Sequence, residues 1–290
     1  MGNIFNYWKL TMYSERVTAL ETFNSCPYNF RNIPFDGSNV NTYIAVETGN
    51  IVHIAHQYPV VANILCGIFF DETLPALTGE RNNLKKEQTY KMIDLACWWI
   101  EEFKDYEKYF EVKNSMIIEW MLVTGSYDCL ILDKDWTYWL FDYKTAANIS
   151  YYQNRVEKAQ IMIYAYFIMK QFNVDKIKVS YQIYVKGKNN AKATTERKTK
   201  MMYLNTCWNV NQIEYIDNIW EKVERLVRNY KLAKENDIFC PKDQNDDGSA
   251  NSKCRYCPLA RGDKAAAMWL EICPLKSWGA TLDSDGEINF

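Results

Sequence analysis

Two aspartates and a lysine are the side chains of this sequence best suited to chemistry. Asp128 and Asp142 stand in one largely apolar stretch, and Lys144 follows Asp142 by two positions. Carboxylates and an ammonium in such surroundings are costly to bury unless another group compensates their charge. A divalent cation would do so, and magnesium prefers oxygen ligands with retained water. The stretch therefore predicts a metal site that could make a water molecule nucleophilic.

The local structure expected around these residues is a β-hairpin. The apolar runs Cys129–Leu132 and Trp139–Phe141 flank a polar turn, which is typical of two paired strands. Alternate residues of a strand share a face, so Asp142 and Lys144 should project together. A loop with an odd number of residues would set Asp128 directly across from Asp142, whereas a two-residue loop would put them on opposite faces. We expect an odd loop or a bulge.

Length and composition favour a large globular protein of the cytoplasm. The 290 residues are 48% hydrophobic and 15% aromatic, with a formal net charge of −2. This balance is not basic overall, so any contact with nucleic acid must come from local patches. No uninterrupted apolar run reaches the roughly 18 residues of a membrane span, and the N-terminus lacks a signal-peptide layout. The nine cysteines are therefore expected to be reduced, some of them on a metal.

Helical and strand-like segments alternate along the chain. Apolar residues recur at helical spacing over residues 84–109, 154–170 and 212–235, and the segments 117–122 and 177–185 are typical of strands. This order predicts an α/β fold with a mixed central sheet flanked by helices.

A cluster of positive charge follows the last of these strands. The run reads as a basic loop over residues 186–200, interrupted by the single acid Glu196. Its place after the core strands makes it a candidate for nucleic-acid contact. The basic residues concerned are Lys186, Lys188, Lys192, Arg197, Lys198 and Lys200.

Four short motifs occur in order along the chain. They are Gly49-x-x-x-His53, Gly125-x-x-Asp128, Asp142-Tyr143-Lys144-Thr145 and Gln160-x-x-x-Tyr164. Their order and gaps resemble the RecB-type branch of the PD-(D/E)XK nucleases, which includes AddB-like proteins and CRISPR-adaptation exonucleases with iron–sulfur clusters. Residues 20–30 also resemble the opening helix and Cys-Pro-aromatic turn of that family. The resemblance spans roughly residues 17–260 and implies a restriction-endonuclease-like core.

The resemblance also assigns roles to these residues. It implies that His53, Asp128, Asp142 and the backbone carbonyl of Tyr143 hold Mg²⁺ or Mn²⁺, and the imidazole would favour manganese somewhat. Lys144 would orient or activate the attacking water and steady the phosphate.

Four other polar residues have expected roles beside those of the predicted metal site. Gln160 and Tyr164 are neighbours on one helix surface, and the resemblance implies that they position the substrate and the Lys144 ammonium. Glu119, one strand before the hairpin, is a further candidate for a second metal or for the water network. His56 is expected to be a hydrogen-bonded structural histidine.

The cysteines form a second constellation. Cys254 and Cys257 are spaced to chelate one metal, as in zinc and iron–sulfur sites. The iron–sulfur relatives take one ligand from the N-terminal turn and three from the tail, which implies Cys26, Cys254, Cys257 and a fourth cysteine. Cys273 and Cys240 compete for that place, and Cys273 lies farther beyond Cys257 than the family pattern has. A zinc site made by the four tail cysteines is the alternative to a structural 4Fe–4S cluster.

The expectation for the whole chain is a metal-dependent DNA nuclease, with exonuclease action on ends or single strands. Residues 1–237 would form the nuclease core, and a Cys-rich tail, residues 238–290, would clip back onto the N-terminal turn. The chain has no G-x-x-x-x-G-K-[ST] phosphate loop, so unwinding would need a helicase, recombination or adaptation partner; no membrane partner is expected. The alternatives are a structure-specific endonuclease and a non-catalytic DNA-end-binding or assembly subunit on the same fold.

Overall fold

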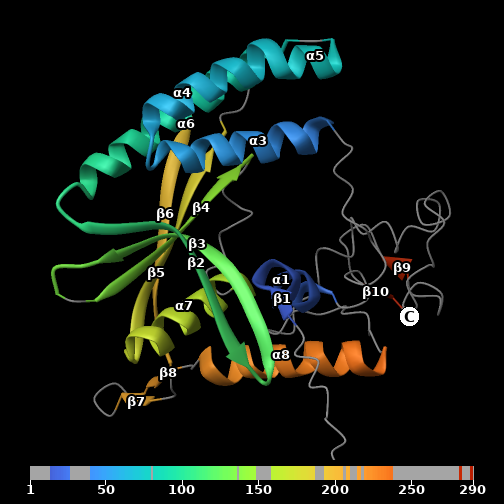
Figure 1. The fold of residues 1–290 in the computed structure, drawn as a ribbon, viewed down its shortest axis with the longest axis vertical. Helices are drawn as coiled ribbons and strands as arrows, with labels where there is room; N and C mark the ends of the chain where they lie inside the picture. The colour runs from blue at the N-terminus through green and yellow to red at the C-terminus, as the bar shows by residue number, and fades with distance from the viewer. Residues whose placement is uncertain are drawn as a thin grey trace, which may run out of the picture. The chain divides into compact units, whose positions relative to one another are not determined.

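The structure is a computed structural model. It describes residues 14–26, 40–79, 81–135, 137–147, 158–186, 193–204, 207–209, 214–216, 219–237, 281–282 and 288–289. The chain divides into two compact units. Figure 1 labels the helices and strands named below. The central unit comprises residues 35–113 and 126–220, and the terminal unit comprises residues 1–34, 114–125 and 221–290. Each unit is described by itself.

A mixed sheet forms the middle of the central unit. Strand β3 (Met121–Leu132) pairs antiparallel with β4 (Tyr138–Ala146), β4 pairs parallel with β5 (Lys176–Val185), and β5 pairs antiparallel with β6 (Thr194–Tyr203). Two parallel strands need a crossover between them, and helix α7 (Ala159–Phe172) lies in the connection from β4 to β5. Strand β2 (Glu107–Ile118) pairs with β3.

Helices cover both faces of this sheet. On one face, Trp99 and Phe103 at the end of helix α6 (Asn83–Glu102) pack against Phe141 and Tyr143 of β4. Successive strand residues point to opposite faces, so Asp142 and Lys144 project toward the other side, where α7 packs against β5. The predicted α/β architecture, a mixed sheet flanked by helices, is confirmed.

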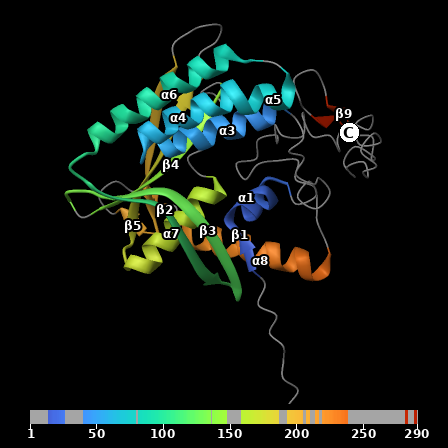
Figure 2. The same cartoon turned by 45° about the horizontal axis from the view of Figure 1, so that its top comes forward.

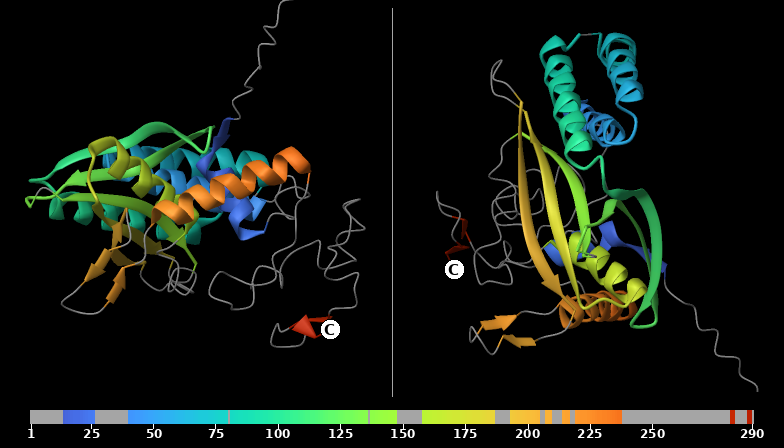
Figure 3. Two further views of the ribbon diagram at one scale, coloured as in Figure 1. Left: turned by 90° about the horizontal axis from the view of Figure 1, so that it is seen from below. Right: turned by 90° about the vertical axis from the view of Figure 1, so that its left-hand side faces the viewer.

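Helix α6 also belongs to a helical layer. Helix α3 (Val40–Ala55), helix α4 (Pro59–Ile68), a π-helical turn (Phe69–Thr73) and helix α5 (Leu74–Thr78) pack with it (Figure 2 and the right panel of Figure 3). Their shared core is apolar and includes Val52, Ala55, Ala62, Phe70 and Met92. Helix α3 packs against β4 as well, so this layer fixes one helix directly over the strand of the predicted motif.

One helical stretch is apolar over an unusual length. Among the described residues, the helical stretch Pro59–Thr78 is long and apolar enough, by length and composition alone, to cross a membrane. The sequence has no uninterrupted apolar run of this length, because Asp71 and Glu72 interrupt it. In the structure the π-helical turn that contains these two acids connects α4 to α5, so the helical stretch is continuous. Helices in the core of water-soluble proteins pass the same test of length and composition.

The terminal unit joins the two ends of the described chain. Strand β1 (Ser14–Arg16) pairs parallel with β3 from Leu122 to Thr124, and helix α1 (Val17–Ser25) follows it. Helix α8 (Ile219–Asn236) lies mostly in this unit and packs the ring of Tyr230 edge-on against Phe23, with centroids 5.1 Å apart. The terminal unit also has the short antiparallel pair β9 (Thr281–Leu282) with β10 (Ile288–Asn289), and the central unit has the pair β7 (Cys207–Asn209) with β8 (Glu214–Ile216).

Two predicted boundaries differ from the structure. Helix α6 ends at Glu102 rather than near residue 109, because the segment from Glu107 onward alternates in exposure as a strand does. The strand expected over residues 117–122 is interrupted by a turn between β2 and β3. Glu119 and Trp120 both have positive φ, 48° and 63°. Turns with this conformation usually contain Gly or Asn, so the residue types at these two positions do not indicate a turn.

Candidate active site

The β3–β4 hairpin sets the two predicted aspartates opposite each other. The paired residues run from Cys129 with Phe141 to Leu132 with Tyr138, which leaves residues 133–137 in the connection. This is an odd number, as expected. Continuing the same register places Asp128 directly across from Asp142.

The strands separate at this point, and a carboxylate takes over the backbone hydrogen bond. The described ladder between β3 and β4 ends at Cys129 and Phe141. Beyond it, the backbone N–H of Tyr143 donates to Oδ2 of Asp128 at 2.6 Å. The Asp128 side chain is thereby held in the gap where the two strands diverge, with 14% of it exposed.

Asp142 and Lys144 form a close ion pair beside this gap. Lys144 Nζ lies 2.6 Å from Asp142 Oδ2, and the Asp142 side chain is only 4% exposed. Burial raises the pKa of Asp142 to about 6; the ammonium of Lys144 opposes this rise, and the charge of Asp128 adds to it. Asp142 is thus a carboxyl group whose negative charge is under-compensated by the protein.

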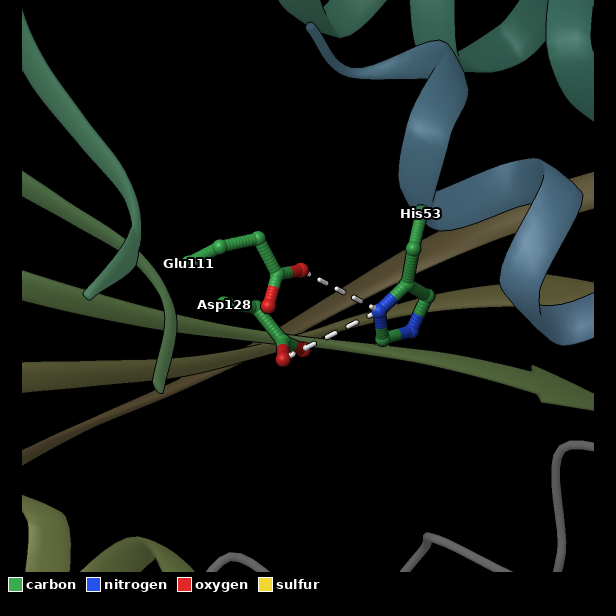
Figure 4. A group of neighbouring side chains, drawn as sticks. All are labelled: His53, Glu111 and Asp128. Atoms are coloured by element: carbon green, nitrogen blue, oxygen red, sulfur yellow. Dashed lines mark ion pairs between the residues drawn. The ribbon is translucent and has the colours of Figure 1, made fainter. Parts of the chain in front are cut away.

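His53 approaches the same gap from helix α3. Its Nε2 lies 2.8 Å from the backbone carbonyl oxygen of Tyr143. A carbonyl can only accept, so Nε2 carries the proton, and in the neutral ring the lone pair belongs to Nδ1. Nδ1 lies 3.8 Å from Oδ1 of Asp128 and 4.0 Å from Oε1 of Glu111 (Figure 4).

Glu111 is a member of this group that the sequence reading missed. His53, Glu111 and Asp128 each offer one ligand atom, and these atoms all lie within 4.8 Å of one another. Burial and the nearby charge of Asp128 raise the pKa of Glu111. The sequence alternates apolar residues at Phe110, Val112, Met116 and Ile118, which lie on the less exposed side of β2, and this alternation is a signal that Glu111 lies on a strand.

Helix α7 brings the last motif to the site. Tyr164 is buried, and its hydroxyl is hydrogen-bonded to Gln160 one turn earlier. Burial raises the pKa of this hydroxyl, the charges of Asp142 and Asp128 raise it further, and Lys144 lowers it. The tyrosine therefore lies within electrostatic reach of the carboxylates and the ammonium, as the motif order led us to expect.

His56 is a structural histidine, as predicted. It is buried, its Nδ1 donates to the carbonyl of Val52 at 2.9 Å, and its Nε2 accepts from the hydroxyl of Tyr184 at 2.6 Å. The ring stacks on that of Tyr143 with centroids 3.5 Å apart. Burial lowers the pKa of His56 to about 3, so the ring stays neutral.

The predicted basic loop is in part a strand. Residues 194–203 form β6, and the Arg197 guanidinium binds both carboxylate oxygens of Glu102 at 2.7 Å and lies over the rings of Phe103 and Phe141. Because these contacts engage the Arg197 guanidinium, we do not expect it to bind nucleic acid. Lys198 pairs with Glu196 on the same strand.

The structure describes two of the four remaining lysines of the basic run. Burial lowers the pKa of Lys186, and the neighbouring Lys85 lowers it further. Lys200 lies on β6. Lys188 and Lys192 lie outside the described residues.

The remaining predicted ligands belong to the terminal unit or to undescribed segments. Glu119 forms an ion pair with Arg228 within the terminal unit. Cys26 follows helix α1 and is partly buried. Cys240, Cys254, Cys257 and Cys273 lie outside the described residues, so the cluster stays a prediction.

The sequence matches a family model over most of its length. The model is that of the PD-(D/E)XK nuclease superfamily, and it matches residues 17–261. The chain therefore belongs to this superfamily, and the mixed sheet with its Asp-x-Lys strand is the core of that fold. No curated protein matches the sequence.

Two solved structures resemble the chain in outline. One is the protein SSO0001, with 11% identity, a TM-score of 0.34, and coverage of 91% of this chain and 86% of the other. The second, from Eubacterium rectale, bears a provisional name as an exonuclease; it has 11% identity, a TM-score of 0.48, and coverage of 83% of this chain and 89% of the other. With 11% sequence identity and TM-scores below 0.5, neither structure supports a functional conclusion for this chain.

Proposed function

We propose that this protein is a divalent-metal-dependent deoxyribonuclease. The observation that supports the proposal most is a convergence of side chains from separate elements. His53 from α3 and Asp128 from β3 lie together, and the buried pair of Asp142 and Lys144 on β4 stands beside the same gap between the strands. Superfamily membership supplies the reaction class, hydrolysis of phosphodiester bonds.

The donor set fits a hard divalent cation. It offers carboxylate oxygens and one imidazole nitrogen with a free lone pair, a combination suited to Mg²⁺ and especially to Mn²⁺. His53 and Asp128 would hold the ion, and Asp142 would join them with the oxygen that Lys144 leaves free. When bound, such a cation lowers the pKa of a coordinated water and neutralises charge on a phosphate.

Lys144 and the α7 pair would act on the substrate side of the site. The Lys144 side chain is 21% exposed, so its ammonium reaches solvent while remaining anchored to Asp142. An ammonium there can donate to an attacking water or to a non-bridging phosphate oxygen. Tyr164, which lies within electrostatic reach of Lys144, and its hydrogen-bond partner Gln160 would keep the ammonium in position.

The substrate is proposed to be DNA with free ends or single-stranded segments, cut by exonuclease action. The resemblance to RecB-type nucleases supports this choice over a structure-specific endonuclease. A non-catalytic DNA-end-binding subunit would keep the fold but would not need the buried Asp142 carboxylate with Lys144 beside it. Unwinding of duplex DNA would come from a helicase or recombination partner.

The test is a digestion assay with the purified full chain. Linear single-stranded DNA, linear duplex and closed circular DNA are incubated with Mn²⁺, with Mg²⁺ and with chelator. We expect metal-dependent shortening of linear substrates, which is lost in Asp142→Ala and kept in Asp135→Asn, a substitution in the loop of the same hairpin. Cleavage of circular DNA would favour an endonuclease, and binding without turnover under either ion would favour the non-catalytic subunit.

We further propose that Cys26 and three tail cysteines hold a structural 4Fe–4S cluster. The resemblance supports this assignment, with zinc as the alternative metal. Purified anaerobically, the protein should be brown and contain about four irons per chain, as a cubane cluster requires. One bound zinc and no visible absorption would replace the cluster with a zinc site.

A further inference from the structure

Glu111 stands in the candidate metal centre although no motif contains it. Its carboxylate, the Asp128 carboxylate and His53 Nδ1 come from β2, β3 and α3, three elements of the central unit (Figure 4). The two measured separations from Nδ1 are 3.8 Å to Asp128 and 4.0 Å to Glu111. Direct hydrogen bonds are shorter than this, so the three groups face one another without being bonded.

The size of this triangle suits a small cation. With separations of 3.8 Å and 4.0 Å from Nδ1 and at most 4.8 Å between the carboxylate oxygens, an equidistant point lies about 2.3–2.5 Å from each atom, slightly more than the roughly 2.1 Å of Mg²⁺–oxygen bonds. A slight inward movement of side chains would complete the contact. Glu111 is the member best able to move, because 51% of its side chain is exposed whereas 14% of Asp128 is.

The orientation of the imidazole supports the same centre. Nε2 of His53 is engaged by the carbonyl oxygen of Tyr143, which fixes the proton there and turns the Nδ1 lone pair toward Glu111 and Asp128. Ligating histidines commonly donate their other N–H to a backbone carbonyl in this way. On this geometry the Tyr143 carbonyl orients His53, whereas the family resemblance gave that carbonyl the place of a ligand.

We propose that Glu111 is a ligand of the nuclease metal, in addition to His53, Asp128 and Asp142. The proposal rests on the proposed function, because it concerns the same metal. It adds a further carboxylate, from a strand that lies in the sequence between the Gly49–His53 motif and the Gly125–Asp128 motif. The site then binds its cation from β2 and α3 as well as from the hairpin.

The backbone at Glu111 supplies a discriminating variant. Its φ is 48°, a left-handed conformation that a glutamate adopts only with strain and a glycine adopts freely. Glu111→Gly therefore removes the carboxylate while relaxing the strand. Loss of metal affinity in a variant that unfolds no earlier than the parent cannot be ascribed to misfolding.

The experiment measures Mn²⁺ binding without DNA, by the loss of the free-ion EPR signal. The full chain is titrated alongside Glu111→Gln, Glu111→Gly and Glu107→Gln, the last being a glutamate exposed on the same side of β2 but outside the triad. We expect both Glu111 variants to bind Mn²⁺ at least about tenfold more weakly and Glu107→Gln to bind like the parent. Thermal unfolding in chelator is recorded for each.

The outcomes separate this inference from the proposed function. Parent-like Mn²⁺ affinity in both Glu111 variants would overturn the role of Glu111 and leave the nuclease proposal standing. A parent chain that binds no Mn²⁺, and digests no DNA with it, would overturn the proposed function and the ligand with it. Equal weakening in Glu107→Gln would show a general charge effect and would also overturn the inference.

Discussion

Replacing Asp142 with asparagine should abolish nuclease activity and yet stabilise the metal-free protein. The carboxyl is buried, and its pKa is raised from 3.8 to about 6 even with Lys144 beside it. At about 1.4 kcal/mol per pKa unit, its ionisation costs the fold about 3 kcal/mol above pH 6. Asparagine has nearly the same shape and carries no charge, so Asp142→Asn should unfold later by about that amount at neutral pH.

The pH dependence gives the sign of this effect. The unfolded chain releases the Asp142 proton near its ordinary pKa of 3.8, and the folded protein keeps it to about 6. Stability from this group is therefore fully present below about pH 4 and declines as the pH rises to 6. The stability difference between variant and parent should grow across that window and stay constant above it.

The assay is urea unfolding in chelator at several pH values from 4 to 8, followed by fluorescence. Mn²⁺ should shrink the stability difference between variant and parent, because a ligand at about 100 times its Kd stabilises the parent by about 2.7 kcal/mol and the variant by less. A variant less stable than the parent at pH 7 in chelator would refute the reasoning. So would a difference that does not change between pH 4 and 6.

Three further substitutions test other parts of the structure. Lys144→Met should cut the rate of DNA hydrolysis by about 10²- to 10³-fold and preserve Mn²⁺ binding, since the lysine acts on water and phosphate; loss of Mn²⁺ binding would contradict this role. Arg197→Met should lower the free energy of unfolding by about 1–2 kcal/mol, through the lost Glu102 pair, and leave DNA affinity unchanged in a mobility-shift assay. Trp120→Gly should raise the free energy of unfolding by about 1 kcal/mol, because φ at Trp120 is 63° and its side chain is 74% exposed. A lower free energy of unfolding would mean that the indole makes stabilising contacts.

The sequence by itself determined the chemistry of the hairpin. Alternation fixes Asp142 and Lys144 on one face whatever surrounds them, and the expected odd loop gave the register that the hairpin has from Cys129 with Phe141 to Leu132 with Tyr138. The order of helices and strands likewise predicted the mixed sheet with helices on both faces. These features depend on contacts close in sequence.

Only the tertiary structure decided which other groups reach that hairpin. Glu111 enters the site because β2 pairs with β3 and because its own backbone is left-handed, and neither fact is written in local composition. From the sequence, Arg197 is one more residue of a basic run. In the structure, Glu102 at the end of α6 and the ring of Phe103 contact its guanidinium. The physical reason is common to both cases. A side chain's charge is given by the sequence, but its partner is chosen by packing between segments far apart in the chain.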